Sequence, residues 1–337
     1  MSLKKESRQM SMIIPNLEEL VDEQHAYCKL LKLIDFEQLC RPLESLYSPI
    51  GRAGYPVSSG FKCLLIQAIE DLSDRQLEAR LQDSLATKLF CGFALNDRTP
   101  DYSYFTVLRE RIGTKRLAEM FARVRSSLKK AGLIREVFSF VDASELHARV
   151  DVWKARDKAI SDRENEERDD DDKPTMNNQN ASKYTSDPEA RYGCKGKNRI
   201  WFGYKRHVSV DMTHGLIHSV AVSPANLPDS KGLKFVCPNG GMVFGDKAYS
   251  ERPAQDALKT RGCFSGAIRK KNMKGKNKGL DSWRTSVRMP FEGVFAHLSK
   301  RVRYRGTVKT QFQAIMQSFG FNFSRLLRIN APPLELL

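Results

Sequence analysis

The sequence lacks the cysteine patterns that build metal ribbons or disulfide frameworks. Its seven cysteines are an odd number, they lie far apart, and no two are spaced as a CxxC pair. Such spacing argues against a zinc ribbon and against a secreted domain held together by disulfides. We therefore expect reduced thiols, and the apolar neighbours of Cys63 and Cys91 predict that these two lie in the core.

Long apolar segments are also missing. Residues 1–9 are polar and charged, unlike a secretory signal segment. No stretch of about 18 consecutive apolar residues occurs, so we expect no membrane span and no membrane partner. The expected location is the cytoplasm, at the nucleoid if the partner is DNA.

Negative charge is in deficit. Lys and Arg number 56 against 40 Asp and Glu, which gives a formal net charge of +16. Nucleic acid is the most common partner of so basic a chain, although a merely soluble basic protein has the same balance. The hydrophobic share of 41% indicates a folded protein with one large core or two smaller ones.

Residues 1–135 have the apolar periodicity of helices. Expected helices span residues 61–70, 72–89, 101–111 and 115–131. Ser73 and Gln76 are spaced as a capping box, and Gly132 is placed to end the last helix. Short helices joined by tight turns suit a DNA-end-binding domain, but any helical bundle shows the same pattern.

Residues 136–328 alternate between strand-like and helical patterns, which predicts an α/β domain with a mixed sheet flanked by helices. Expected strands span residues 137–141, 200–211, 216–222, 242–245 and 263–268, with a helix over 251–261. A charged segment of about 155–190 contains four consecutive aspartates. Adjacent like charges repel, so we predict a flexible insertion rather than a metal site. Residues 329–337 form a C-terminal tail.

Two aspartates, Asp142 and Asp246, directly follow apolar, β-prone runs. Carboxylates there are held at the sheet edge, where ligands of α/β sheets gather, although a single Asp after a strand is ordinary. A third carboxylate, Glu292, is expected near the start of a helix that begins close to Pro290. Taken alone, Glu292 fits a surface residue paired with Arg288.

Three carboxylates that converge need cations between them. Hard oxygen ligands with open positions suit Mg²⁺ or Mn²⁺. Two such ions can clamp an in-line phosphoryl transfer, in which one activates the attacking hydroxyl and the other stabilises the leaving oxygen. The predicted metal ligands and catalytic residues are Asp142, Asp246 and Glu292.

Several motifs follow one another in an order that resembles the bacterial DDE transposases of the insertion-sequence five group, related to the insertion-sequence four group. The resemblance covers about residues 50–328. The motifs are Gly54-Tyr-Pro-Val with residues 67–81, then residues 141–144, 187–197, 202–211, 225–230, 245–249 and 288–305. Each motif is weak singly, and the series is specific.

The resemblance implies a ribonuclease-H-like fold and the metal-binding triad Asp142, Asp246 and Glu292. It implies double-stranded DNA as partner, both the terminal inverted repeats and the target, and a homodimer or larger synaptic complex. Arg288 matches the family's arginine. Two positions depart from the family: Ser299 stands where a lysine is usual, and Thr285 where a tyrosine is usual.

Basic residues flank the predicted glutamate in sequence. We expect them to contact the phosphate backbone, although a solvated surface has the same composition. The predicted DNA contacts are Arg288, Lys270, Lys271, Lys300, Arg301, Arg303, Arg305 and Lys309.

Other candidate residues favour ordinary structural roles. The histidines His207, His214 and His218 flank an expected hairpin turn, which disfavours a shared zinc ion. Trp201 and Tyr204 fit core positions better than a base-stacking surface.

The sequence therefore predicts a transposase that nicks element ends and transfers strands with two divalent ions. A catalytically degenerate DNA-binding repressor derived from a transposase is the alternative, motivated by Ser299 and Thr285. A purely hydrolytic nuclease of the same fold is a further alternative.

Overall fold

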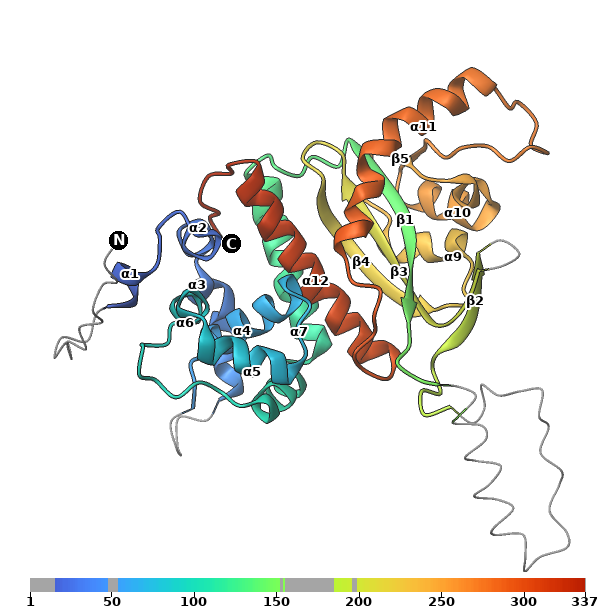
Figure 1. Cartoon of the computed structure of the whole chain (residues 1–337). Coiled ribbons are helices and arrows are strands. Elements are labelled where there is room, and N and C mark those ends of the chain that lie inside the picture. The colour runs from blue at the N-terminus through green and yellow to red at the C-terminus, as the bar shows by residue number, and fades with distance from the viewer. Residues whose placement is uncertain (1–15, 48–53, 152–153, 155–184, 196–198, 337) are drawn as a thin grey trace, which may run out of the picture.

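The computed structural model describes residues 16–47, 54–151, 154, 185–195 and 199–336 (Figure 1). Most of the expected charged insertion, residues 155–184, lies outside the described residues. Residues 185–190, which we had assigned to the insertion, belong to the folded body. Asp187 is buried and accepts a hydrogen bond of 2.6 Å from the Tyr204 hydroxyl.

The N-terminal region is helical, as predicted. Its helices are α1 (Leu17–Leu20), α2 (Ala26–Leu33), α3 (Phe36–Cys40), η1 (Arg41–Leu46), α4 (Val57–Ile69), α5 (Asp74–Asp83), α6 (Leu85–Cys91) and α7 (Tyr102–Lys130). The capping box of Ser73 and Gln76 is confirmed. The single helix expected over 72–89 is wrong, because Ser84 leaves helical geometry, ends α5 and caps α6.

The kink in α7 confirms the predicted division into two helical stretches. Gly113 has a φ of 69° inside this helix, a backbone conformation that residues other than glycine rarely adopt. Gly132, with a φ of 70°, follows the helix end as expected.

The second half forms a six-stranded mixed sheet. Its strands are β1 (Phe138–His147), β2 (Arg191–Lys195), β3 (Arg199–Asp211), β4 (Leu216–Pro224), β5 (Met242–Phe244) and β6 (Phe264–Ser265). The order is β2-β3-β1-β5-β6, and β4 also pairs with β3. Antiparallel pairs join β3 to β1, β2 and β4, whereas β1-β5 and β5-β6 are parallel. This is the sheet arrangement expected of a ribonuclease-H-like domain.

Helices cover both faces of the sheet (Figure 1). One face packs against α9 (Asp229–Val236) and α10 (Arg252–Thr260) through Val141, Leu233 and Leu258. The other face packs against α12 (Thr307–Arg328), which lies between the sheet and the N-terminal helices. None of the described helices combines the length and the hydrophobicity that a membrane-spanning helix needs.

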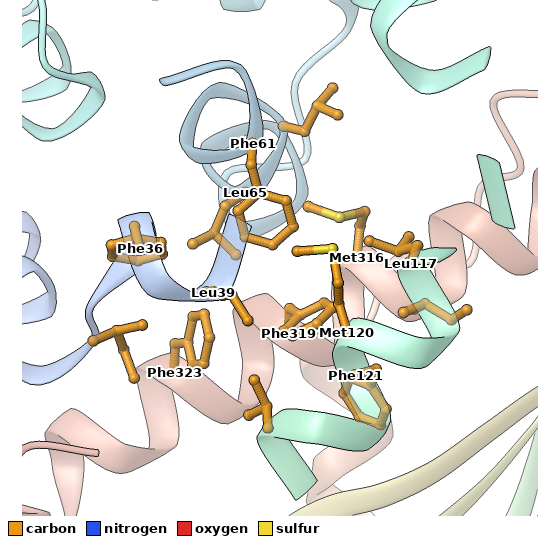
Figure 2. Close-up of a cluster of buried hydrophobic side chains, with 14 of the residues drawn as sticks. Phe36, Leu39, Phe61, Leu65, Leu117, Met120, Phe121, Met316, Phe319 and Phe323 are labelled. Carbon is orange, nitrogen blue, oxygen red and sulfur yellow. The ribbon is translucent and has the colours of Figure 1, made fainter. Parts of the chain in front are cut away.

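One hydrophobic cluster joins the N-terminal helices to α12 and to strands β3 and β4. Figure 2 shows Phe319 of α12 at the centre of this cluster, with Phe61 and Phe121 close to it. Its ring packs edge-on against both, with centroid distances of 5.6 Å to Phe61 and 5.0 Å to Phe121. Cys63 and Cys91 are also buried here, as predicted. The two halves of the chain therefore share one core.

The C-terminal tail also packs on the N-terminal helices. The backbone N–H of Leu334 donates to the Leu33 carbonyl at 2.9 Å, and the side chains of Leu334 and Leu336 are buried. Helix α2 and the end of the described chain are thereby held together.

Candidate active site

Asp142 lies inside β1 rather than at its end, which corrects the expected strand boundary. The strand continues to His147 because residues 143–147 keep pairing with β3. Asp142 Oδ1 accepts a 2.8 Å hydrogen bond from the Ala143 backbone N–H. Burial raises the pKa of Asp142 to about 6, and the negative charge of Asp246 acts in the same direction.

Asp246 stands beside Asp142 because of the parallel register of β1 and β5. Phe140 pairs with Phe244, and each aspartate lies two residues further along its strand direction. Asp246 also caps the short helix η4 (Lys247–Ser250), where its Oδ1 accepts from the Ala248 N–H at 2.8 Å. The chain direction thus turns at Asp246, two residues past the last residue pair that joins β1 and β5.

The helix that carries Glu292 differs from the prediction. Helix α11 (Lys278–Glu292) begins after the cap Asn277 and ends at Glu292, so the expected start near Pro290 is wrong. Pro290 lacks a backbone N–H and cannot continue the hydrogen-bond ladder. The chain tightens into η5 (Gly293–His297) directly afterwards.

One stripe of α11 faces a hollow beside Asp246. Asp281, Thr285, Arg288 and Glu292 are separated by four, three and four residues, so they lie on the same side of the helix. The first three line a hollow of about 570 Å³ together with Asp246. Glu292 continues this stripe by one turn.

Glu292 is exposed and forms an ion pair with Arg288, whose Nη2 lies 2.7 Å from Glu292 Oε1. Because Glu292 is open to solvent, the pair contributes about 1 kcal/mol, so other ligands can compete for either partner. Within the described part of the chain, no three His, Cys, Asp or Glu side chains are grouped closely enough to hold a metal ion. The convergence of all three predicted ligands stays a prediction.

Basic side chains are the most numerous kind in the wall of this hollow, four of its nine lining residues. Its basic residues are Lys247, Lys276, Lys278 and Arg288. Two buried polar atoms at this wall, Arg288 Nε and Asp281 Oδ2, find no hydrogen-bond partner among the described residues. An unpaired guanidinium donor in a basic hollow suits a phosphate oxygen.

Sequence reasoning missed Asp281 and Lys247 as members of this wall. Asp281 precedes Glu292 by three helical turns, so helical periodicity was the only signal that pointed to it. Lys247 directly follows Asp246, and its proximity to the hollow depends on the turn at η4.

The other predicted DNA contacts fall into two groups. Three are paired with acids: Lys270 with Glu251, Arg303 with Asp71, and Lys309 with Glu110. The remainder have exposed side chains, namely Lys271, Lys300, Arg301 and Arg305. Their contact with DNA stays a prediction.

The three histidines have separate hydrogen-bond partners. Nε2 of His207 lies 2.8 Å from Ser223 Oγ, and Nε2 of His218 lies 2.8 Å from Ser209 Oγ. His214 Nδ1 lies 2.9 Å from the Leu133 carbonyl oxygen. Trp201 and Tyr204 are buried, which confirms their expected place in the core.

Buried histidines make the folded chain sensitive to acid. Burial lowers the pKa of both His207 and His218 to about 4, below the ordinary value of 6.5. The neutral histidines leave the free energy of unfolding undiminished above pH 6.5. As the pH falls towards 4, protonation of the unfolded chain lowers the free energy of unfolding, by about 2 kcal/mol for each histidine at pH 5. The raised pKa of Asp142 offsets about 1 kcal/mol of this loss.

We expect a net fall in unfolding free energy between pH 7 and pH 5, measurable by urea titration. His218→Asn removes one of the two titrating histidines, so the free energy of unfolding should fall clearly less steeply with pH in this variant. Equal slopes for the wild-type chain and this variant would show that His218 is not held neutral by burial.

Comparison with known protein families identifies two parts of the chain. Residues 163–318 match the family described as Transposase DDE domain, and residues 15–111 match the one described as Transposase domain (DUF772). The chain thus contains one region that matches a transposase DDE domain and, before it, one that matches a second transposase domain. Its DDE domain has the predicted ribonuclease-H-like fold.

Both Asp246 and Glu292 lie within the matched part of the DDE transposase domain, whereas Asp142 precedes it. Among solved structures, the chain is similar to a piggyBac transposase in a cryo-EM synaptic complex with hairpin DNA. The sequence identity is 8% and the TM-score 0.37, over 91% of this chain and 74% of the other. So distant a similarity carries no argument about this site.

Proposed function

We propose that this chain is a DDE transposase of the insertion-sequence five group, which nicks the ends of its own element and transfers the freed 3′ ends into target DNA. The observation that carries the proposal is the position of Asp142 and Asp246, each two residues past the paired residues Phe140 and Phe244, with Asp246 lining a hollow that has four basic side chains. The carboxylates suit a cation, and the basic wall suits the phosphate backbone.

The two aspartates fit a divalent metal. Asp142 is half-buried, and burial disfavours its negative charge and raises its pKa. A cation between Asp142 and Asp246 would relieve this cost, and oxygen donors match Mg²⁺ or Mn²⁺. When bound, two such ions would activate the attacking hydroxyl and stabilise the leaving oxygen.

The ion pair of Arg288 with Glu292 suggests how Glu292 could join Asp142 and Asp246 at the metal site. Arg288 already lines the hollow and has an unpaired Nε. A phosphate in the hollow competes for the guanidinium, because a bidentate arginine–phosphate pair is favourable. Once Arg288 binds the phosphate, the Glu292 carboxylate would lose its ion-pair partner. It would then be available to a metal ion at Asp142 and Asp246.

The partners follow from this chemistry. Double-stranded DNA is the substrate, as terminal inverted repeats and as target, and two ends must be held together during transfer. We therefore propose a homodimer or a larger synaptic complex. The exposed residues Lys271, Lys300, Arg301 and Arg305 are available to the phosphate backbone outside the hollow.

A second function, that of a degenerate transposase acting as a DNA-binding repressor, is favoured by one observation. Glu292 is bound to Arg288 rather than placed among the aspartates. The departures at Thr285 and Ser299 point the same way. In that case the chain binds its element ends without cutting them.

A nicking and strand-transfer assay separates these functions. Purified full-length chain is mixed with duplex DNA that carries the element ends and with a target plasmid, with Mg²⁺ or with EDTA. We expect nicked and joined products that appear only with the metal. Binding without cleavage would support the repressor, and cleavage without joined products would support a hydrolytic nuclease.

A further inference from the structure

Arg206 is a fully buried arginine whose hydrogen-bond partners are all uncharged. Its relative exposure is 0%, and within the described residues no acidic side chain pairs with it. Burial lowers the pKa of its guanidinium to about 9. A buried charge without a counter-charge is costly, so its presence calls for a reason other than stability.

The guanidinium connects three separate parts of the fold. Its Nε donates to Ser144 Oγ of β1 at 3.3 Å, and Nη1 donates to Gln317 Oε1 of α12 at 2.7 Å. The carbonyl oxygens of Leu298 and Ser299 each accept at 3.3 Å from Nη2 and Nη1. Three nitrogens in one rigid plane thus fix three elements relative to each other.

One of these elements carries a proposed metal ligand, and another follows one closely in the chain. Ser144 lies two residues after Asp142 on β1, and the Leu298–Ser299 peptide follows Glu292 by only one short helix, η5. The next residues are tied to the same strand: the His147 N–H donates to the Lys300 carbonyl, and the Val302 N–H donates to the His147 carbonyl. The segment after Glu292 is therefore anchored to the strand of Asp142.

We propose that Arg206 is a positioning residue that sets the distance between Asp142 and the helix end bearing Glu292. The inference rests on the proposed function, because it concerns the same metal site. Lysine at this position keeps the charge but presents one nitrogen on a flexible stem, and it cannot hold the three elements in one plane. Misplacement of a ligand by about 1 Å can lower a rate by about a hundredfold.

The test compares Arg206→Lys with two control variants of the full chain. Leu39→Ala removes a buried side chain of α3 and lowers stability without touching this region, and Arg261→Lys makes the same chemical change at an exposed arginine of the α10 end. Each variant is assayed for metal-dependent nicking at a temperature where thermal unfolding shows it to be folded. Amide hydrogen exchange of residues 298–302 is measured in parallel.

We expect Arg206→Lys to lower the nicking rate by about ten- to a hundredfold and to speed amide exchange at residues 298–302 by about tenfold. Arg261→Lys should stay within about twofold of the wild-type chain in both measurements. Leu39→Ala should stay within about twofold in nicking, and its lower stability should speed exchange across the shared core rather than at residues 298–302 alone. If Arg206→Lys does not fold, Gln317→Met, which removes one acceptor, should show the same changes at smaller size.

Two results would overturn the proposal. One is unchanged exchange at residues 298–302 in the folded variant, and the other is a loss of nicking no larger than that of Leu39→Ala. Failure of the proposed function has a different signature, since the wild-type chain would then make no nicked product. In that case amide exchange would still show whether Arg206 holds residues 298–302 in place. The proposed role of Arg206 in positioning catalytic ligands would be rejected.

Discussion

Asp142→Asn and Asp246→Asn should each lower the rate of strand cleavage by about a thousandfold or more, a loss of about 4 kcal/mol of transition-state stabilisation. Each substitution removes a negative charge that a divalent ion needs, and changes the side-chain shape little. The Ala143 and Ala248 N–H groups keep an oxygen acceptor in both variants. Single-turnover cleavage of end-containing DNA measures the effect.

End binding provides the internal comparison for these variants. It should stay within about twofold of the wild-type chain, because the basic side chains are unchanged. Asp256→Asn on α10 is a matched control, since it makes the same change at an exposed aspartate away from the hollow. Full cleavage by either active-site variant would remove that aspartate from the mechanism.

Glu292→Gln extends the same test to the third carboxylate. The side chain of Gln keeps the helix intact but binds a divalent ion poorly, so a comparable loss of cleavage is expected if Glu292 leaves Arg288 and joins the aspartates. A loss of less than about threefold would show that Glu292 serves only as the partner of Arg288.

Phe319→Ala should lower the free energy of unfolding by about 3 to 5 kcal/mol, the usual cost of removing a buried phenyl ring. Phe319 is fully buried and its ring contacts aromatic rings of α4, α7 and α12 itself. Because this cluster includes strands β3 and β4, we expect the helical region and the sheet to be destabilised together. Urea unfolding followed by circular dichroism and by tryptophan fluorescence measures both.

The control for this prediction is Phe264→Ala, which removes the same ring from a position that is 71% exposed. Its effect should be below about 0.5 kcal/mol. A Phe319→Ala chain in which the helices unfold first, at a separate midpoint from the sheet, would show that the two halves have independent cores.

The sheet of this protein was predictable because its strands have strong local patterns. The apolar runs that precede Asp142 and Asp246 fall on β1 and β5, and the hairpin around Gly215 joins β3 and β4 as expected. The strand end at Asp142 was placed wrongly because pairing with β3, a long-range contact, keeps the backbone extended as far as His147.

The end of the chain was harder to predict for physical reasons. Pro290 is typical of a first helical turn, but here it lies in the last turn of α11, whose start is fixed by the Asn277 cap. The role of α12 as the layer between sheet and helices depends on packing, which periodicity alone does not reveal. Likewise, the burial of Arg206 has no local signal, since Lys205 and His207 beside it are also polar.

The most direct test of the metal site is anomalous diffraction from the full chain bound to end DNA and Mn²⁺. The account predicts manganese peaks within coordination distance of both Asp142 and Asp246, with Arg288 turned to a phosphate and Glu292 among the ligands. Manganese peaks that lie away from these aspartates, or DNA bound on a surface remote from the hollow, would contradict it.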